Sequence, residues 1–110
     1  MASFRENLAA IHWVGSKPEA VILLTFEYGE EEDVWVGECI ELGTVAQARK
    51  LEQLRKEVAE AVLLQLNQME ELGFVEAFLN EHNVERVPIA GEGERSKSGP
   101  PWSLPQLVGA

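Results

Sequence analysis

Seven carboxylates lie between Val21 and Gly43, a stretch with no Lys or Arg and therefore a net charge of −7, in a chain whose net charge is −10. Such a group can hold a divalent cation or attract a basic partner. A metal site needs oxygens that converge, whereas consecutive glutamates in a turn diverge, and EF-hand spacing is absent. We therefore expect an acidic surface with no metal and no cofactor. The carboxylates are Glu27, Glu30, Glu31, Glu32, Asp33, Glu38 and Glu41.

The same concentration of negative charge bears on nucleic acids. It repels a phosphate backbone, so we expect no direct nucleic-acid binding by this chain. Phe26, Tyr28 and Trp35 are accordingly expected to pack in a hairpin core or an interface rather than to stack on bases.

The other reactive side chains do not form a recognised catalytic motif. Cys39 is the one cysteine and lies in a strand-like run, so we expect it to be buried as a small hydrophobic residue. His12 and His82 show no ligand-like spacing and are expected at the surface or at helix ends. A positioned catalytic serine and a phosphate-binding glycine loop are both absent from the sequence. We predict that the protein is not an enzyme.

The seven carboxylates lie within or between two apolar runs, Val21–Tyr28 and Val34–Leu42. Both alternate as strands do, and the five residues 29–33 between them suit a hairpin loop that projects into water. Gly37 in the second run indicates either a β-bulge or a close approach by another backbone or ring, such as a large side chain that faces it across the hairpin. Residues 44–49 alternate weakly and predict a short third strand.

Residues 51–72 carry the clearest pattern in the sequence. Their apolar side chains fall within one arc at 100° per residue, which predicts a long helix packed on the sheet, with Gly73 as its C′ residue. Leu63 and Leu64 lie off that arc. They predict either a homo-oligomer interface, in a dimer or tetramer, or ordinary exposed leucines.

The segments before and after this region carry weaker patterns. Residues 1–20 predict an N-terminal arm or a short helix, ended by the Gly and Pro of residues 15–18. Residues 74–81 predict a second short helix. Residues 84–89 predict a final strand, at a sheet edge because it contains Pro88.

Residues 91–110 are rich in Gly, Pro and Ser and predict a flexible tail. Three apolar residues in it offer ways to dock on this subunit or another one. They are Trp102, Leu104 and Leu107.

Length and composition fit a single globular domain, expected at residues 21–90, in a chain of 110 residues with 45% hydrophobic and 25% charged residues. One cysteine excludes an internal disulfide and fits a reducing compartment. No apolar run is long enough to span a bilayer, and the first residues lack a signal-peptide pattern. We expect a cytoplasmic protein that does not bind membranes.

Residues 21–73 resemble the HicB-like antitoxin family of bacteria and archaea. In that family an acidic hairpin leads to a strand that ends in a Pro-(Asp/Glu)-Leu segment, followed by Gln-Gly-(Asp/Glu)-(Ser/Thr) and a helix with a Glu-Ala pair. Here the matching positions are Glu41-Leu42, Gln47, Leu51-Glu52 and Glu60-Ala61. Four positions depart from the pattern: Ile40, Ala48, Arg49 and Lys50. Lys50 replaces the capping Ser or Thr, which weakens the helix start by ~1 kcal/mol.

The resemblance implies an α+β fold of the truncated ribonuclease H-like type, in the order β-β-β-α-β. A three-stranded antiparallel sheet packs on one long helix, and a short C-terminal edge strand follows. It also implies a non-enzymatic protein that forms dimers or tetramers and masks a small basic ribonuclease toxin, HicA. The family's DNA-binding segment is not recognisable after residue 90. The partner-binding residues expected on this basis are Glu27, Glu30, Glu31, Glu32, Asp33, Trp35, Glu38 and Glu41.

Two other functions remain open. The first is an orphan member of the family that serves as a homo-oligomeric scaffold or adaptor, in which the acidity provides only solubility. The second is a divergent enzyme that uses Glu27, Glu38 and Glu41 to hold a divalent ion for a nuclease-like reaction.

Overall fold

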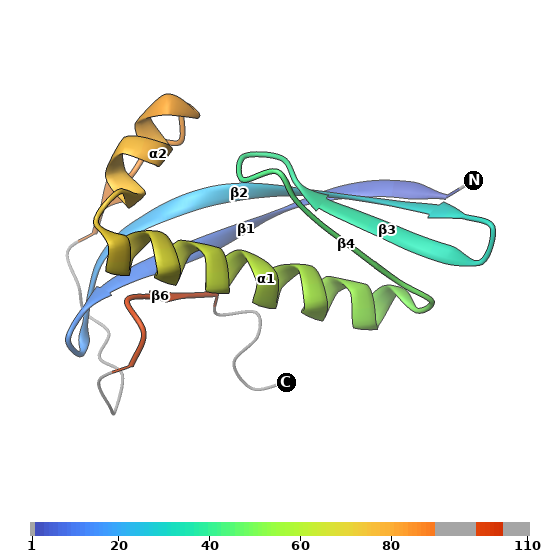
Figure 1. Ribbon diagram of the computed structural model, residues 1–110, viewed down its shortest axis with the longest axis horizontal. Coiled ribbons are helices and arrows are strands. Elements are labelled where there is room, and N and C mark those ends of the chain that lie inside the picture. The colour runs from blue at the N-terminus through green and yellow to red at the C-terminus, as the bar shows by residue number, and fades with distance from the viewer. Residues whose placement is uncertain (1, 90–98, 105–110) are drawn as a thin grey trace.

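A computed structural model describes residues 2–89 and 99–104 and shows an α+β fold with one curled antiparallel sheet and two helices (Figure 1). The strand order is β4-β3-β2-β1-β6, and β5 pairs with β2. The α+β class is as expected. The sheet is larger than the expected three strands and an edge strand, because both ends of the chain join it.

The sheet is built on a long, curved hairpin of β1 (Ser3–Val14) and β2 (Lys17–Glu31). Gly15 supplies the positive φ of +63° that its turn requires. The helical alternative for residues 1–20 is therefore wrong. Phe4, Leu8 and Ile11 have helix-like spacing, but Leu8, Ala10 and His12 alternate along one face of a strand, and that period is the one the structure adopts.

The remaining strands extend the hairpin on both sides. β3 (Val34–Cys39) pairs with β2, and β4 (Thr44–Ala48) pairs with β3. β5 (Val87–Pro88) pairs with Ala20 and Val21 of β2, which shortens the predicted 84–89 strand to two residues. β6 (Trp102–Ser103) pairs with β1.

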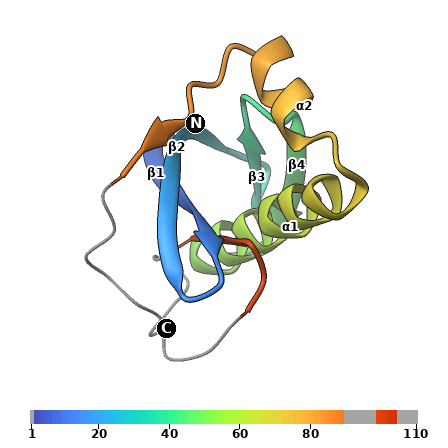
Figure 2. The ribbon, with the colours of Figure 1, turned by 90° about the vertical axis from the view of Figure 1, so that its left-hand side faces the viewer.

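The long helix α1 (Leu51–Leu72) has the predicted bounds and ends at Gly73, whose φ is +81°. Lys50 makes no side-chain capping bond, as its residue type predicts. A short helix α2 (Val75–Glu81) follows. Viewed end-on, α1 lies between the β1–β2 hairpin on one side and β3 and β4 on the other (Figure 2). None of the described helices is long and apolar enough to cross a membrane.

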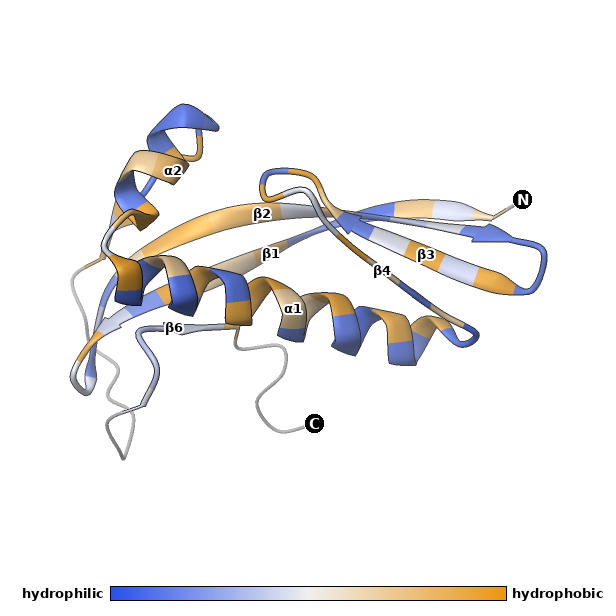
Figure 3. Cartoon of the chain, in the orientation of Figure 1, coloured by the Kyte–Doolittle hydropathy of each residue, from blue (hydrophilic) through white to orange (hydrophobic). Residues whose placement is uncertain are grey.

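The core lies between the inner face of the sheet and the apolar stripe of α1, and the hydrophilic side of α1 is turned away from the strands (Figure 3). Ile22, Leu24 and Phe26 of β2 are fully buried. Gly37 lies opposite Tyr28, the large side chain expected there, although a five-residue loop would have placed Thr25 opposite it. A Cβ at Gly37 would lie 3.0 Å from Tyr28 Cδ1 and 3.2 Å from Leu54 Cδ2, so only glycine fits without a shift.

The C-terminal segment contributes to this core. Trp102 is 1% exposed and Leu104 is fully buried, so the docking expected of these two residues is confirmed. The ordered strand at 102–103 differs from the flexible tail expected there. Residues 90–98 and Leu107 lie outside the described residues.

Candidate functional site: an acidic groove on the outer sheet face

The acidic hairpin extends β2 and β3 farther than the sequence suggests. The strands continue to Glu31 and resume at Val34, so the loop is Glu32-Asp33 rather than the five residues expected. Both loop residues have positive φ, 47° and 67°, which matches the twist of a two-residue hairpin. Their side chains are exposed at the tip.

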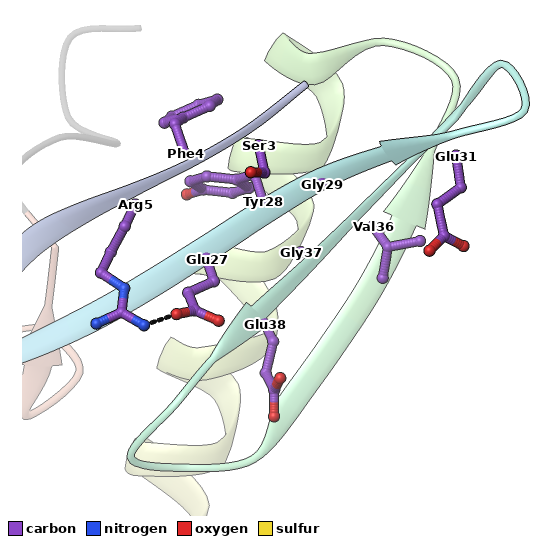
Figure 4. Close-up of a pocket in the computed structure, with 10 residues that line it drawn as sticks. All are labelled: Ser3, Phe4, Arg5, Glu27, Tyr28, Gly29, Glu31, Val36, Gly37 and Glu38. Carbon is purple, nitrogen blue, oxygen red and sulfur yellow. Dashed lines mark ion pairs between the residues drawn. The ribbon is translucent and has the colours of Figure 1, made fainter. Parts of the chain in front are cut away.

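Below the tip, the face of the sheet opposite α1 carries two carboxylates side by side. Glu27 and Glu38 are direct neighbours across β2 and β3. Arg5 is the neighbour of Glu27 on the other side and forms an ion pair with it (Figure 4). Like charges opposed in a sheet are destabilising, and Arg5 relieves this for one of the two glutamates.

These side chains border a groove of about 490 Å³. Gly29 contributes to its lining, and a Cβ built there meets nothing within 4 Å, so the absent side chain leaves open space. Glu27, Glu31 and Glu38 supply negative charge, and Arg5 is the one basic residue among the ten that line the groove. The groove is therefore open and negatively charged, and Val36 supplies part of its apolar lining. We call its three glutamates, with Glu32 and Asp33 at the tip, the acidic surface.

Three residues expected at a partner surface lie elsewhere. Glu30 and Trp35 are opposed in the ladder on the same side of the sheet as Tyr28 and Gly37, and Trp35 packs against the core. Glu41 turns towards β2, where its carboxylate accepts hydrogen bonds from the Thr25 backbone N–H at 2.7 Å and the Thr25 hydroxyl at 2.8 Å. Glu41 therefore holds the end of β3 against β2.

The two leucines predicted at an oligomer interface also separate. Leu63 is partly buried and packs against the core. Leu64 is 61% exposed. Only Leu64 is placed on the surface as an interface residue requires.

A second charged cluster, absent from the sequence-based expectations, lies at the turn end of the β1–β2 hairpin. His12, expected at the surface, is only 7% exposed. Its Nδ1 is 2.5 Å from Glu19 Oε2, and its Nε2 is 2.7 Å from Glu70 Oε1. The surface expectation for His12 rested on the absence of a ligand-like spacing and is wrong, because strand alternation puts His12 on the buried face with Ala10.

Further bonds join this His12 cluster to the C-terminal segment. Trp102 Nε1 donates to Glu70 at 3.1 Å, and its indole ring lies 4.8 Å from the His12 ring. Arg86 donates to Glu19 at 3.0 Å. Partial burial alone would raise the pKa of Glu19, but the hydrogen bond from His12 and the charge of Arg86 outweigh it, so that pKa lies below its ordinary value of 4.5.

The remaining reactive groups have structural surroundings. Burial raises the pKa of the Cys39 thiol to about 11, so it is protonated at neutral pH and is a poor nucleophile. Within residues 2–89 and 99–104, no three His, Cys, Asp or Glu side chains are grouped as a metal ion would require.

Comparison of the chain with protein-family models, with curated proteins and with solved structures finds no match.

Proposed function

We propose that this chain is a non-enzymatic binding protein whose acidic surface engages a basic protein. The observation that carries the proposal is the groove over Gly29, where Glu27, Glu31 and Glu38 surround an open hollow beside a single arginine. Carboxylates arranged in this way attract Lys and Arg side chains and steer their approach.

The surroundings of the reactive groups support a binding role. The pKa of the Cys39 thiol is raised, and both His12 nitrogens are paired with carboxylates of the same chain. Two carboxylates of the acidic surface, Glu27 and Glu38, lie instead where β1 and β4 flank the β2–β3 pair, so the sheet fixes their positions.

The kind of basic partner follows from the resemblance of residues 21–73 to HicB-like antitoxins. We propose a small ribonuclease toxin of the HicA type, masked by this chain in the cytoplasm. A gene for a short basic protein beside the gene for this chain is the expected arrangement.

The test uses that short basic protein, or a purified HicA-type toxin, as the probe. The association rate is measured over a range of salt concentrations with the full chain and with the variant Glu31→Lys/Glu38→Lys. A steered association falls with salt, and the variant is expected to associate about 10- to 100-fold more slowly at low salt.

The matched control is Glu60→Lys/Glu71→Lys, which makes the same change in net charge at two exposed positions of α1. It is expected to keep most of the association rate. Equal loss in both variants, or association independent of salt, would contradict a role for the acidic surface. Toxin cleavage of RNA that continues unchanged at saturating chain would contradict the masking role.

A further inference from the structure

Among residues 2–89 and 99–104, no strand pairs with the outer edge of β1 along its first half. β2 pairs with β1 over Ser3–Val14, whereas on the other side β6 pairs only with Ile11 and His12. The Trp13 N–H donates to Pro101 O at 2.6 Å on that side. Because backbone direction alternates along a strand, the N–H and C=O groups of Arg5, Asn7 and Ala9 also point away from β2.

The unpaired part of the β1 edge begins at Ser3, where the strand begins, and ends before Leu104. The antiparallel register of Ile11 with Ser103 places the buried Leu104 next in line, beside Ala10. The free edge therefore runs over residues 3–9, and no other strand among the described residues pairs with it there.

This edge lacks the features that block strand addition. Residues 3–9 contain no Pro or Gly, and their register with β2 is regular, since the one irregularity lies at His12/Trp13. Arg5 and Glu6 are engaged by Glu27 and Arg55 of the same chain. At the other end of the sheet, α1 packs against β4, and the Thr44 hydroxyl donates to Gln65 Oε1 at 2.5 Å. An open, regular edge accepts an extended segment, as β6 already shows on β1.

We propose that the occupant is a second copy of this chain, paired through antiparallel β1 strands about a two-fold axis at Glu6. This register uses residues 3–9 of each copy from end to end. It places Arg5 opposite the partner's Asn7, so that their outward backbone groups exchange hydrogen bonds. It also covers Phe4, which is 40% exposed, with the partner's Leu8.

Strand length and space select this register over its neighbours. Within residues 3–9, an axis at Arg5 pairs only residues 3–7, and an axis at Asn7 drives the partner's Phe4 into the place of Leu104. At Glu6 the two carboxylates that meet each hold an Arg55 guanidinium through two hydrogen bonds, at 2.9 and 2.8 Å. Two carboxylates and two guanidinium groups then alternate around the axis, without a net charge.

The first test measures self-association by sedimentation velocity over about a hundredfold range of concentration. The wild-type chain is expected to show a monomer–dimer equilibrium. Asn7→Pro removes an outward N–H that makes no bond to β2 and is expected to abolish the dimer, whereas Asn7→Ala keeps that N–H and the dimer. A wild-type chain that stays monomeric, or a dimer that survives Asn7→Pro, overturns the proposal.

The second test determines the register in which the two β1 strands pair. Residues opposed without hydrogen bonds have Cα atoms about 4.5 Å apart, within the span of a disulfide. Glu6→Cys is therefore expected to cross-link two chains rapidly under mild oxidation, and Asn7→Cys to cross-link slowly. The reverse order overturns the register at Glu6. Cys39 is buried and serves as the unreactive background in both variants.

Discussion

Carboxylate side chains have different surroundings at the two ends of the β1–β2 hairpin. At the turn end, Glu19 and Glu70 are bonded by His12, Arg86 and Trp102. At the other end, Glu27 and Glu38 face each other across two strands, and the tip residues Glu32 and Asp33 project into solvent. The carboxylates of the turn end therefore make several bonds within the fold, whereas at the other end Arg5 pairs with Glu27 alone and Glu38 faces a like charge. We call the first the structural end and the second the acidic end, on which the proposed binding function rests.

The largest expected effect comes from removing the anchor of the structural end. Trp102→Ala removes a buried indole that contacts the His12 ring and bonds Glu70. We expect a loss of about 3–5 kcal/mol in the free energy of unfolding, measured with urea. Leu64→Ala, at an exposed helix position, is the control and should change stability by less than about 0.5 kcal/mol. Similar losses of stability in both variants would contradict the role of Trp102 as the anchor of this end of the hairpin.

The next largest effect tests the packing beneath the acidic end. Gly37→Ala places a methyl group 3.0 Å from the Tyr28 ring and 3.2 Å from Leu54. We expect a cost of about 1–3 kcal/mol in the free energy of unfolding. Gly29→Ala is the matched control on the neighbouring strand, where the added carbon meets open space. A larger loss for Gly29→Ala than for Gly37→Ala would contradict this account.

A smaller effect, of opposite sign, is expected in the acidic surface itself. Glu38→Lys replaces the repulsion with Glu27 by an attraction and should stabilise the fold by about 0.2–1 kcal/mol, while it slows association with a basic partner. Urea unfolding and the association rate are measured on the same preparation. A variant that is destabilised, or that binds unchanged, would show that Glu38 is not held there for recognition.

The smallest effect is a pH dependence at the structural end. The pKa of Glu19 is lower in the folded state than its ordinary value of 4.5. The charged carboxylate therefore contributes stability above about pH 4.5, and this contribution is lost as the pH falls through the lower pKa of the folded state. The urea midpoint of the wild-type chain should therefore fall more between about pH 5 and pH 3 than that of Glu19→Gln. Equal falls would show that His12 and Arg86 do not stabilise the charged carboxylate.

The parts of the fold predicted from the sequence are those with long local patterns. Helix α1 has the predicted bounds because an apolar arc over six turns has no competing explanation. The β2–β3–β4 strands also follow from alternation, although the acidic turn is tighter than expected. Positive φ at Glu32 and Asp33 is uncommon for these residue types, so the sequence favours a longer loop.

The parts that could not be predicted depend on contacts between distant residues. β1 carries apolar spacings that fit a helix as well as a strand, and only its pairing with β2 decides between them. β6 has two residues, and its strand character comes from the β1 edge and from Asn67, whose side chain accepts the Trp102 N–H at 2.9 Å. The same holds for the His12 cluster, whose members are spread over residues 12–102.

The placement of Trp102 has a consequence for the order of folding. Trp102 follows far behind His12 in the sequence, so this end of the core closes only after Trp102 has been synthesised and has left the ribosome. Helix α1 and the β2–β3 hairpin, which rest on nearer contacts, can form earlier. Until Trp102 docks, the His12 edge of β1 is also unpaired, so a nascent chain exposes a longer sheet edge to its neighbours than the finished protein does.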